Sequence, residues 1–259
     1  MHPFLLHLGG FKLPAYGFMV ALGYSAAIFY LLKSRASFAI TREQTADLVF
    51  YSALSGILGA KVVFAATYWN ELGPDLTSKL LYILKSFKYG FVFYGGFAAG
   101  AVAFFIYCRR HGLSFLKAAD YFAPALALAH GFGRIGCFMA GCCYGRPSPG
   151  SFGVAFTDPL SEIPQAYLGV PLYPTQLIEA AGNFFIFGGI VWLSRRERPL
   201  PGGVILAAYM LAYSILRFLV EFLRGDDRGG AWLGLSPAQT LSVIAASAAI
   251  FIITIVRKK

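Results

Sequence analysis

The sequence predicts an all-α polytopic membrane protein, with seven transmembrane helices and a small irregular cap on the outer side. The composition gives the first reason. Of the 259 residues, 58% are hydrophobic and 13% are charged, whereas soluble proteins are about half apolar and about one quarter charged. The pattern gives the second reason, because the chain contains seven apolar segments of about 20 residues, the length that a helix needs to cross a bilayer.

The seven segments follow one another along the whole chain. They cover residues 16–33, 47–68, 90–108, 119–140, 175–193, 203–222 and 238–256. Two longer connections, 70–89 and 142–174, form the expected cap, and the second is expected to be partly irregular because it holds six prolines and four glycines. We expect a single integral membrane domain, 1–259, whose N-terminus lacks the features of a cleaved signal peptide.

The lysines and arginines set the expected orientation. Twelve of the 22 lie in connections on one side: Lys33, Arg35, Arg42, Arg109, Arg110, Lys117, Arg195, Arg196, Arg198, Arg257, Lys258 and Lys259. Seven lie on the opposite side: Lys12, Lys79, Lys85, Lys88, Arg146, Arg224 and Arg228. Because the cytoplasmic side carries the excess of positive charge, we expect the N-terminus outside and the C-terminus in the cytoplasm. The net charge of +10 therefore reflects topology and does not indicate nucleic-acid binding.

One arginine lies inside an apolar segment. Arg134 belongs to the stretch GFGRIGCFMAGCCYGR, residues 131–146, and has uncharged residues on both sides. A guanidinium keeps its charge in a low-dielectric setting, so an arginine within a membrane span indicates a functional site. The alternative is a helix end whose arginine reaches to the interface and whose glycines serve only packing.

Further polar residues share single faces of two later spans. Arg217 and Glu221 stand four residues apart in RFLVEFLRGDDRG, and a purely structural ion pair is the alternative to a functional role. Three polar residues of the fifth span also share a face, near its expected outer end: Gln176, Glu179 and Asn183. If Arg134 and Arg217 both meet this face, two guanidinium groups line one cavity, which suits an anion and above all a phosphate.

The glycines of the third span and the clustered cysteines are first interpreted as packing residues. Gly96 and Gly100 form a small-xxx-small pair beside Gly95, which is typical of close helix contact. Three of the four cysteines lie within seven residues and lack the spacing of common zinc sites: Cys137, Cys142 and Cys143. We expect them to act as small apolar residues and expect no metal and no cofactor, while metal binding or thiol exchange stays the alternative.

Several stretches resemble, in the same order, segments of the prolipoprotein diacylglyceryl transferases: MHPFLLHLGGFKLPAYGFMVALGY, GRIGCF with GCCYGRP, YPTQLIE and RFLVEFLRGDDRG. The resemblance spans nearly the whole chain. It implies a bacterial inner-membrane protein with seven spans, whose active site opens to the periplasmic leaflet. It also implies the first step of lipoprotein maturation. In that step, the diacylglyceryl group of phosphatidylglycerol moves to the lipobox cysteine thiol of a preprolipoprotein, which forms a thioether and releases glycerol 1-phosphate.

The resemblance also assigns site residues, one position at a time. Arg134 matches the arginine of the GRxGN signature, and Arg217 matches that of the RFxxE motif. Glu221 is the glutamate of the second motif, Tyr16 matches a tyrosine of the first span, and Gly145 closes the signature. Catalytic roles are expected of Arg134, Arg217, Tyr94 and Tyr16. Substrate binding is expected of Arg134, Arg217, Glu221, Gly95, Gly96, Gly145, Gln176 and Glu179.

The chain departs from the family pattern at three positions. Cys137 stands where the best-known members have asparagine, and Cys142 where they have glutamate. Tyr94 stands where many members have the histidine of an HGG motif. That histidine is often regarded as the base that takes the thiol proton, so the base is unassigned here. An electropositive pocket formed by the two arginines could itself favour the thiolate, with the two tyrosines orienting the substrates.

Two other classes of function stay open. A membrane thiol or metal protein would use the three clustered cysteines, and an anion transporter would use the two arginines as its path. A transporter is disfavoured because the chain lacks two related halves with glycine-broken or proline-broken spans. The expected partners are phosphatidylglycerol, a preprolipoprotein signal peptide with its lipobox cysteine, and membrane lipids, without nucleic acid.

Overall fold

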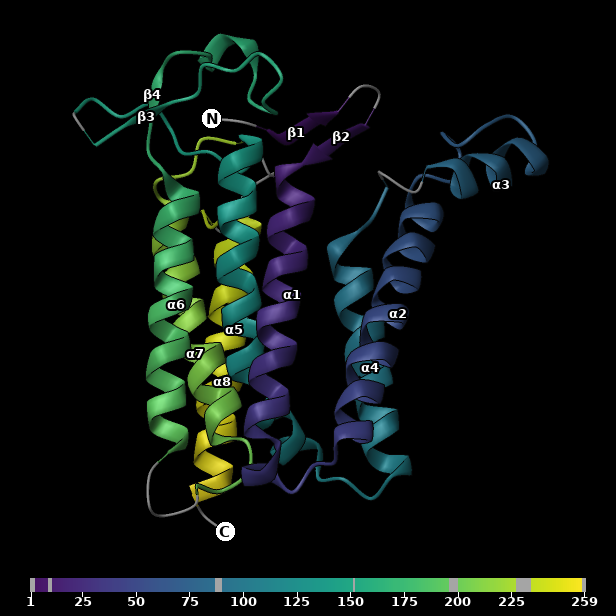
Figure 1. Ribbon diagram of the computed structural model, residues 1–259, viewed down its shortest axis with the longest axis vertical. Coiled ribbons are helices and arrows are strands. Elements are labelled where there is room, and N and C mark those ends of the chain that lie inside the picture. Colours follow the sequence, from purple (N-terminus) through teal and green to yellow (C-terminus); the bar gives the residue numbers. More distant parts are fainter. Residues whose placement is uncertain are drawn as a thin grey trace. The chain divides into compact units, whose positions relative to one another are not determined.

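The structure is a computed structural model that describes residues 3–8, 11–86, 90–150, 152–195, 200–226 and 234–257. Most of it is helical (Figure 1). The helices are α1 (Ala15–Ser34), α2 (Arg42–Thr67), α3 (Leu76–Lys85), α4 (Phe93–Arg110), α5 (Phe115–Ala140), α6 (Thr175–Ser194), α7 (Val204–Glu221) and α8 (Pro237–Arg257). Two antiparallel strand pairs join β1 (Phe4–Leu8) to β2 (Phe11–Pro14) and β3 (Val154–Ala155) to β4 (Pro171–Leu172).

The expected class of a helical membrane protein is confirmed. Six helices of the described residues are long and apolar enough to cross a membrane: α1, α2, α5, α6, α7 and α8. The seventh expected segment is also helical, as α4, but Arg109 and Arg110 end it and lower its mean hydropathy. The count of seven spans and the orientation stay predictions. Several cations used for the orientation lie outside the described residues: Lys88, Arg196, Arg198, Arg228, Lys258 and Lys259.

The chain packs as two compact units. Unit 1 consists of Met1–Ser34 and Ala119–Lys259, and unit 2 consists of Arg35–Ala118. Unit 1 therefore contains α1, nearly all of α5, and α6 to α8, whereas unit 2 contains α2, α3 and α4. The expectation of a single domain stays a prediction.

Unit 2 is held together by the contact between α2 and α4, where glycines let the two helices lie close together. A β-carbon added at Gly59 would lie 2.7 Å from the carbonyl oxygen of Gly95, and one added at Gly95 would lie 2.8 Å from that of Gly59. Gly96 is equally close to α2, because its added β-carbon would lie 2.9 Å from the carbonyl oxygen of Gly56. The two backbones therefore touch, which only residues without a β-carbon allow.

The ends of the unit 2 helices are fixed by local hydrogen bonds. Thr41 and Gln44 form a capping box at the start of α2, in which each side chain accepts from the backbone N–H of the other residue. The Asp75 side chain accepts from the backbone N–H of Ser78 and caps α3. Helix α3 lies in the cap segment 70–89, for which the sequence analysis predicts no helix.

Helix α5 contacts its neighbours in unit 1 through buried polar groups as well as through apolar packing. The Tyr121 hydroxyl donates to the backbone oxygen of Leu31 at 2.6 Å and joins α5 to α1. The Asp120 carboxylate accepts from the backbone N–H groups of Gly203 at 2.6 Å and Leu206 at 2.7 Å. Asp120 thus caps α7 from another helix, where a negative charge also favours the helix dipole.

The cap segment 142–174 has a small core of its own. Four apolar side chains of this segment are buried against one another: Tyr144, Phe156, Ile163 and Leu172. Leu172 belongs to β4, which pairs with β3. The N-terminal hairpin of β1 and β2 lies at the same end of unit 1 as β3 and β4 (Figure 1). This hairpin was not predicted, although Gly9 and Gly10 between two short apolar runs are a hairpin signal.

Candidate functional site

Arg134 lies in the second half of α5 and is held by two neighbours. Its Nη2 is 3.0 Å from Oε1 of Glu179, and its Nε donates to Nε2 of His130 at 3.2 Å. The Arg134 side chain is 14% exposed and that of Glu179 is fully buried. A buried charge is tolerated only when it is paired, so Glu179 fixes the position and the direction of this guanidinium. The arginine of α5 thereby meets the polar face of α6.

The polar face of α6 is buried along its length. Gln176, Glu179 and Asn183 are each 0% exposed. The Gln176 Nε2 donates to the backbone oxygen of Cys142 at 2.8 Å, and the Asn183 Nδ2 donates to that of Glu179 at 2.8 Å. In the described part of the chain, three oxygens of this face have no hydrogen-bond partner: Gln176 Oε1, Glu179 Oε2 and Asn183 Oδ1. Buried acceptors without partners are costly, so this face suits contact with water or a substrate.

Two residues that the sequence analysis did not select complete the Arg134 cluster. Tyr213 of α7 donates to Oε1 of Glu179 at 3.0 Å, and its ring centroid lies 4.8 Å from that of His130. Because Nε2 of His130 accepts an N–H of Arg134, this nitrogen carries no proton. The helical spacing could have indicated His130, which stands four residues before Arg134. Tyr213 reaches the cluster only through the packing of α7, which no local pattern reveals.

Arg217 lies on α7 and pairs with Glu221 one turn later, as the spacing predicts. Its Nη2 is 2.6 Å from Oε2 of Glu221, while Oε1 of the same carboxylate accepts from the Ser236 hydroxyl at 2.7 Å. The contact lacks hydrogen-bond alignment, and neither Nη atom of Arg217 has a hydrogen-bond partner among the described residues. The side chain is nevertheless only 8% exposed. A buried guanidinium that keeps free N–H donors has the chemistry to bind an anion.

The two arginines share one electrostatic environment. Arg134, Glu179 and Arg217 all act on the imidazole of His130. The three side chains come from the second half of α5, the start of α6 and the end of α7. These helix ends lie at the same end of unit 1 as β3 and β4 (Figure 1). The cluster is therefore next to the cap segment and away from the opposite end of the helices.

Tyr16 lies at the start of α1 and packs on α5. A β-carbon added at Gly136 would lie 3.2 Å from Cδ2 of Tyr16, so this glycine makes room for the ring. The Tyr16 hydroxyl is within electrostatic reach of Arg134. Tyr16 is still 46% exposed, which leaves the ring accessible for contact with a substrate.

Gly145 lies where three chain segments meet. Its N–H donates to the backbone oxygen of Tyr173 at 3.1 Å, and the next N–H, of Arg146, donates to that of Leu223 at 2.9 Å. A β-carbon added at Gly145 would lie 2.8 Å from the same oxygen of Leu223. The structure thus gives Gly145 a packing role, joining the cap to the end of α7, and its expected role in substrate binding stays a prediction.

The remaining candidates lie in unit 2. Tyr94 is 57% exposed at the start of α4, where its ring lies edge-on to that of Phe93 with the centroids 5.7 Å apart. Gly95 and Gly96 face α2 and have a packing role. The catalytic role expected of Tyr94 and the substrate-binding role expected of the two glycines stay predictions.

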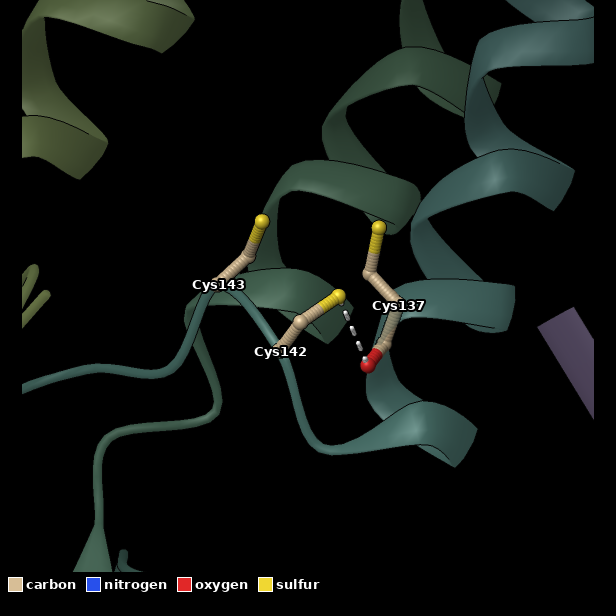
Figure 2. Close-up of side chains that lie close together, drawn as sticks. All are labelled: Cys137, Cys142 and Cys143. Atoms are coloured by element: carbon tan, nitrogen blue, oxygen red, sulfur yellow. Dashed lines mark hydrogen bonds between the residues drawn. The ribbon is translucent and has the colours of Figure 1, made fainter. Parts of the chain in front are cut away.

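The three clustered cysteines converge at the end of α5. The Sγ atoms of Cys137, Cys142 and Cys143 all lie within 4.8 Å of one another, and Figure 2 shows the three side chains together. They form the one group of histidine, cysteine or acidic side chains in the described residues that could hold a metal ion. All three are half-buried.

Comparison with known proteins gives a consistent result. The family model for prolipoprotein diacylglyceryl transferase matches residues 3–255. A phosphatidylglycerol–prolipoprotein diacylglyceryl transferase of Clostridium tetani is 35% identical over 99% of this chain and 98% of its own length. The second such transferase of Clostridium perfringens is 37% identical over 90% of this chain and 87% of its own. That of Pseudoalteromonas atlantica is 34% identical over 93% and 84%.

Proposed function

The chain belongs to the prolipoprotein diacylglyceryl transferase family, and we propose that Arg134 and Arg217 bind the phosphate of phosphatidylglycerol during the transfer. The enzyme transfers the diacylglyceryl group of phosphatidylglycerol to preprolipoproteins, the first step of lipoprotein maturation. The acceptor is the thiol of the lipobox cysteine in the signal peptide.

The observation that carries this proposal is the buried guanidinium of Arg217, whose Nη2 lies against Glu221 and whose Nη1 is left without a partner among the described residues. Its two Nη atoms are buried and have no hydrogen-bond partner in the described residues. A phosphate oxygen supplies the acceptors that these donors need, and a planar guanidinium can bind two such oxygens at once. Arg134 is already oriented by Glu179 and His130, so it adds a second positive charge without further ordering.

The chemistry follows from this arrangement. The acceptor thiol loses its proton, and its sulfur attacks the glycerol carbon that carries the phosphate ester. A C–S bond forms, the C–O bond breaks, and the phosphate oxygen leaves with the electron pair as glycerol 1-phosphate. Negative charge grows on that oxygen in the transition state, where the two arginines stabilise it. Tyr16 and Tyr94 orient the lipid and the thiol by hydrogen bonds.

The site opens to the periplasmic leaflet of the bacterial inner membrane. Six apolar helices together with α4 support seven spans, and the charge pattern supports an outer N-terminus and a cytoplasmic C-terminus. The polar cluster of unit 1 is next to the cap segment, which this topology puts outside. A periplasmic site suits a signal peptide whose lipobox cysteine has reached the outer side of the membrane.

Mass spectrometry tests this function. The purified protein is incubated with phosphatidylglycerol and a lipobox peptide, and the peptide is analysed for a diacylglyceryl adduct on its cysteine. We expect an adduct in equal amount to the glycerol 1-phosphate released, and none with a peptide whose cysteine is replaced by serine. A wild-type protein that forms no adduct, or that moves anions across vesicles without one, contradicts the proposal.

A further inference from the structure

The three thiols at the end of α5 lie together although they come from two different parts of the backbone, a helix and a loop. Cys137 belongs to the last turn of α5, and Cys142 and Cys143 follow in the connecting loop (Figure 2). Their Sγ atoms lie within 4.8 Å of one another although the side chains are half-buried. Cys108, by contrast, is fully buried in α4 and stands alone, as a packing cysteine does.

The loop that carries two of these thiols is held in place by α6. The Gln176 side chain donates to the backbone oxygen of Cys142 at 2.8 Å, and the Thr175 hydroxyl donates to that of Cys143 at 2.9 Å. Cys143 also adopts a left-handed backbone with φ of 62°, which is uncommon for a residue with a β-carbon. The loop thus holds an unfavoured conformation that brings its sulfur to the other two.

We propose that Cys137, Cys142 and Cys143 bind one zinc ion as thiolates, and that the acceptor thiol of the lipobox cysteine takes the fourth position on that ion. This inference rests on the proposed function. Among the described residues, no further cysteine, histidine or acidic side chain lies with these three thiols as a fourth ligand. Three protein ligands and one open position are typical of a catalytic zinc site, whereas structural zinc sites have four protein ligands.

The geometry requires only small side-chain movements. Zinc–sulfur bonds are about 2.3 Å long, so a tetrahedral site places its sulfurs about 3.8 Å apart. The three Sγ atoms, at most 4.8 Å apart, reach that distance through shifts of about 1 Å or less. Rotations about the Cα–Cβ bonds can move the sulfur atoms by such amounts, while hydrogen bonds from α6 hold the backbone carbonyl groups of Cys142 and Cys143.

The charges around the cluster suit an anionic metal complex. Three thiolates outnumber the two positive charges of zinc by one, and the acceptor thiolate adds a further negative charge. Arg134 stands three residues before Cys137 on α5, and it acts electrostatically on Cys137 and Cys143. Arg224, which is paired with Asp226, lies beside Cys143. Each guanidinium is shared with a carboxylate, so the two arginines partly offset the negative charge of the complex.

A zinc ion bound by the three cysteines would allow the acceptor thiol to lose its proton, a step for which the residues around Arg134 provide no base. The histidine near Arg134 is His130, and its Nε2 already accepts a hydrogen bond from that arginine. A thiol that coordinates zinc is deprotonated by the metal, and its proton passes to water. The zinc-bound sulfur then attacks the glycerol carbon, and the phosphate ester oxygen leaves with the electron pair. The product is a neutral thioether, a weak ligand that leaves the zinc.

The test measures metal binding separately from activity. The full-length protein is purified under reducing conditions, loaded with Zn²⁺ or Co²⁺, and compared with Cys137→Ala, Cys142→Ala, Cys143→Ala and the matched control Cys108→Ala. We expect about one zinc ion per chain in the wild type and in the control, and loss of bound zinc in the other three variants. In the Co²⁺ protein, addition of a lipobox peptide should change the thiolate charge-transfer band, and a peptide with serine in place of cysteine should not.

The outcomes separate this inference from the proposed function. If metal-free protein forms the adduct at the wild-type rate, the zinc inference is wrong and the proposed transferase function is retained. Metal binding with the peptide-dependent spectral change, but without an adduct, supports the inference and overturns the proposed function. Wild-type protein that binds no zinc with its three thiols reduced, or in which two of them form a disulfide that is required for activity, also overturns the inference.

Discussion

The two units differ in the helix contacts described above, a glycine contact in unit 2 and a buried ion pair in unit 1. In unit 2, Gly59 of α2 and Gly95 of α4 bring two backbones into contact, and the unit depends on the absence of side chains there. In unit 1, Arg134 and Glu179 lie buried in a contact between helices, and the unit depends on how these charges pair. A side chain added at the glycine contact would clash with the facing backbone. Removal of one partner of the ion pair would leave the other charge buried and uncompensated.

The difference shows where chemistry can occur in this fold. A contact between glycines is complete in itself, because each backbone fills the space that the other leaves. The polar cluster of unit 1 is incomplete, because Nη1 of Arg217 and three oxygens of the α6 face have no hydrogen-bond partner in the described part of the chain. Substitutions in unit 1 should therefore affect the reaction first, and those at the α2–α4 contact should affect folding first.

Loss of either arginine should have the largest effect. Arg134→Ala and Arg217→Ala should each lower kcat/KM by at least about a hundredfold, because charge on the leaving phosphate is no longer stabilised. Lysine at either position should restore little, since it cannot bind two oxygens in the plane of a guanidinium. The matched control is Arg109→Ala at the exposed end of α4, which should keep near wild-type activity in the adduct assay. Equal activity in all variants would contradict the claim that the charged residues of unit 1 carry out the reaction.

Removal of the buried carboxylate should affect both folding and function. Glu179→Ala leaves Arg134 without its ion pair and Tyr213 without its acceptor, which should cost roughly 3–5 kcal/mol of stability. Thermal unfolding in detergent measures the loss, with Glu71→Ala at an exposed position of unit 2 as the control. If the two variants unfold at the same temperature, the pair does not hold the cluster together.

The glycine contact should fail on addition of a single methyl group. Gly59→Ala places a β-carbon against Ala99 and 2.7 Å from the Gly95 oxygen, so it should destabilise unit 2 by about 1–3 kcal/mol. Gly189→Ala on α6 is the matched control, because nothing lies within 4 Å of its added β-carbon. Hydrogen exchange should increase in α2 and α4 of the first variant alone. Unchanged exchange in both helices would mean that the contact is looser than described.

Tyr94 tests whether unit 2 takes part in the reaction. Tyr94→Phe removes one hydroxyl that is expected to orient a substrate, so kcat/KM should fall by roughly tenfold or less, and its pH profile should keep its shape. Loss of one limb of the profile would instead make Tyr94 the base. The comparison uses the same peptide and lipid for both proteins.

The smallest effect is expected at the cap of α3. Hydrogen bonds from the Ser78 hydroxyl and backbone N–H hold the pKa of the Asp75 carboxyl below its ordinary value. The stabilisation is therefore present above the ordinary pKa of aspartate and is lost as the pH falls through the lowered one. Asp75→Ala should increase hydrogen exchange in α3 without a change in activity, and Asp75→Asn, which can still cap the helix, should restore protection. An effect of Asp75→Ala on activity would contradict a purely local role.

Local patterns in the sequence predict most of the helices and part of the site. The apolar runs are long enough to mark α1, α2 and α5 to α8 within a few residues, and the four-residue spacing predicts the pair of Arg217 and Glu221. Helix α3 was missed because it is short and lies in a polar connection. The strands β1 and β2 were also missed, because they are short.

What could not be predicted are contacts between elements that are distant in the sequence. Tyr213 meets Glu179, and Asp120 caps α7, only because the helices pack in this order. The convergence of the cysteines depends on the left-handed backbone of Cys143, which no pattern of residue types encodes. The sequence therefore favoured packing for these thiols, and the structure is what supports a metal site.

The most direct test of the account measures lipid selectivity. Wild-type protein and the Arg217→Ala and Arg109→Ala variants are placed in nanodiscs with equal amounts of phosphatidylglycerol and a diacylglycerol of the same acyl chains. Native mass spectrometry then gives the ratio of the two lipids that stay bound. We expect wild type and Arg109→Ala to prefer phosphatidylglycerol, and Arg217→Ala to lose the preference because the unpaired donors for the phosphate are gone. An unchanged preference in folded Arg217→Ala would contradict the assignment of the phosphate to this arginine.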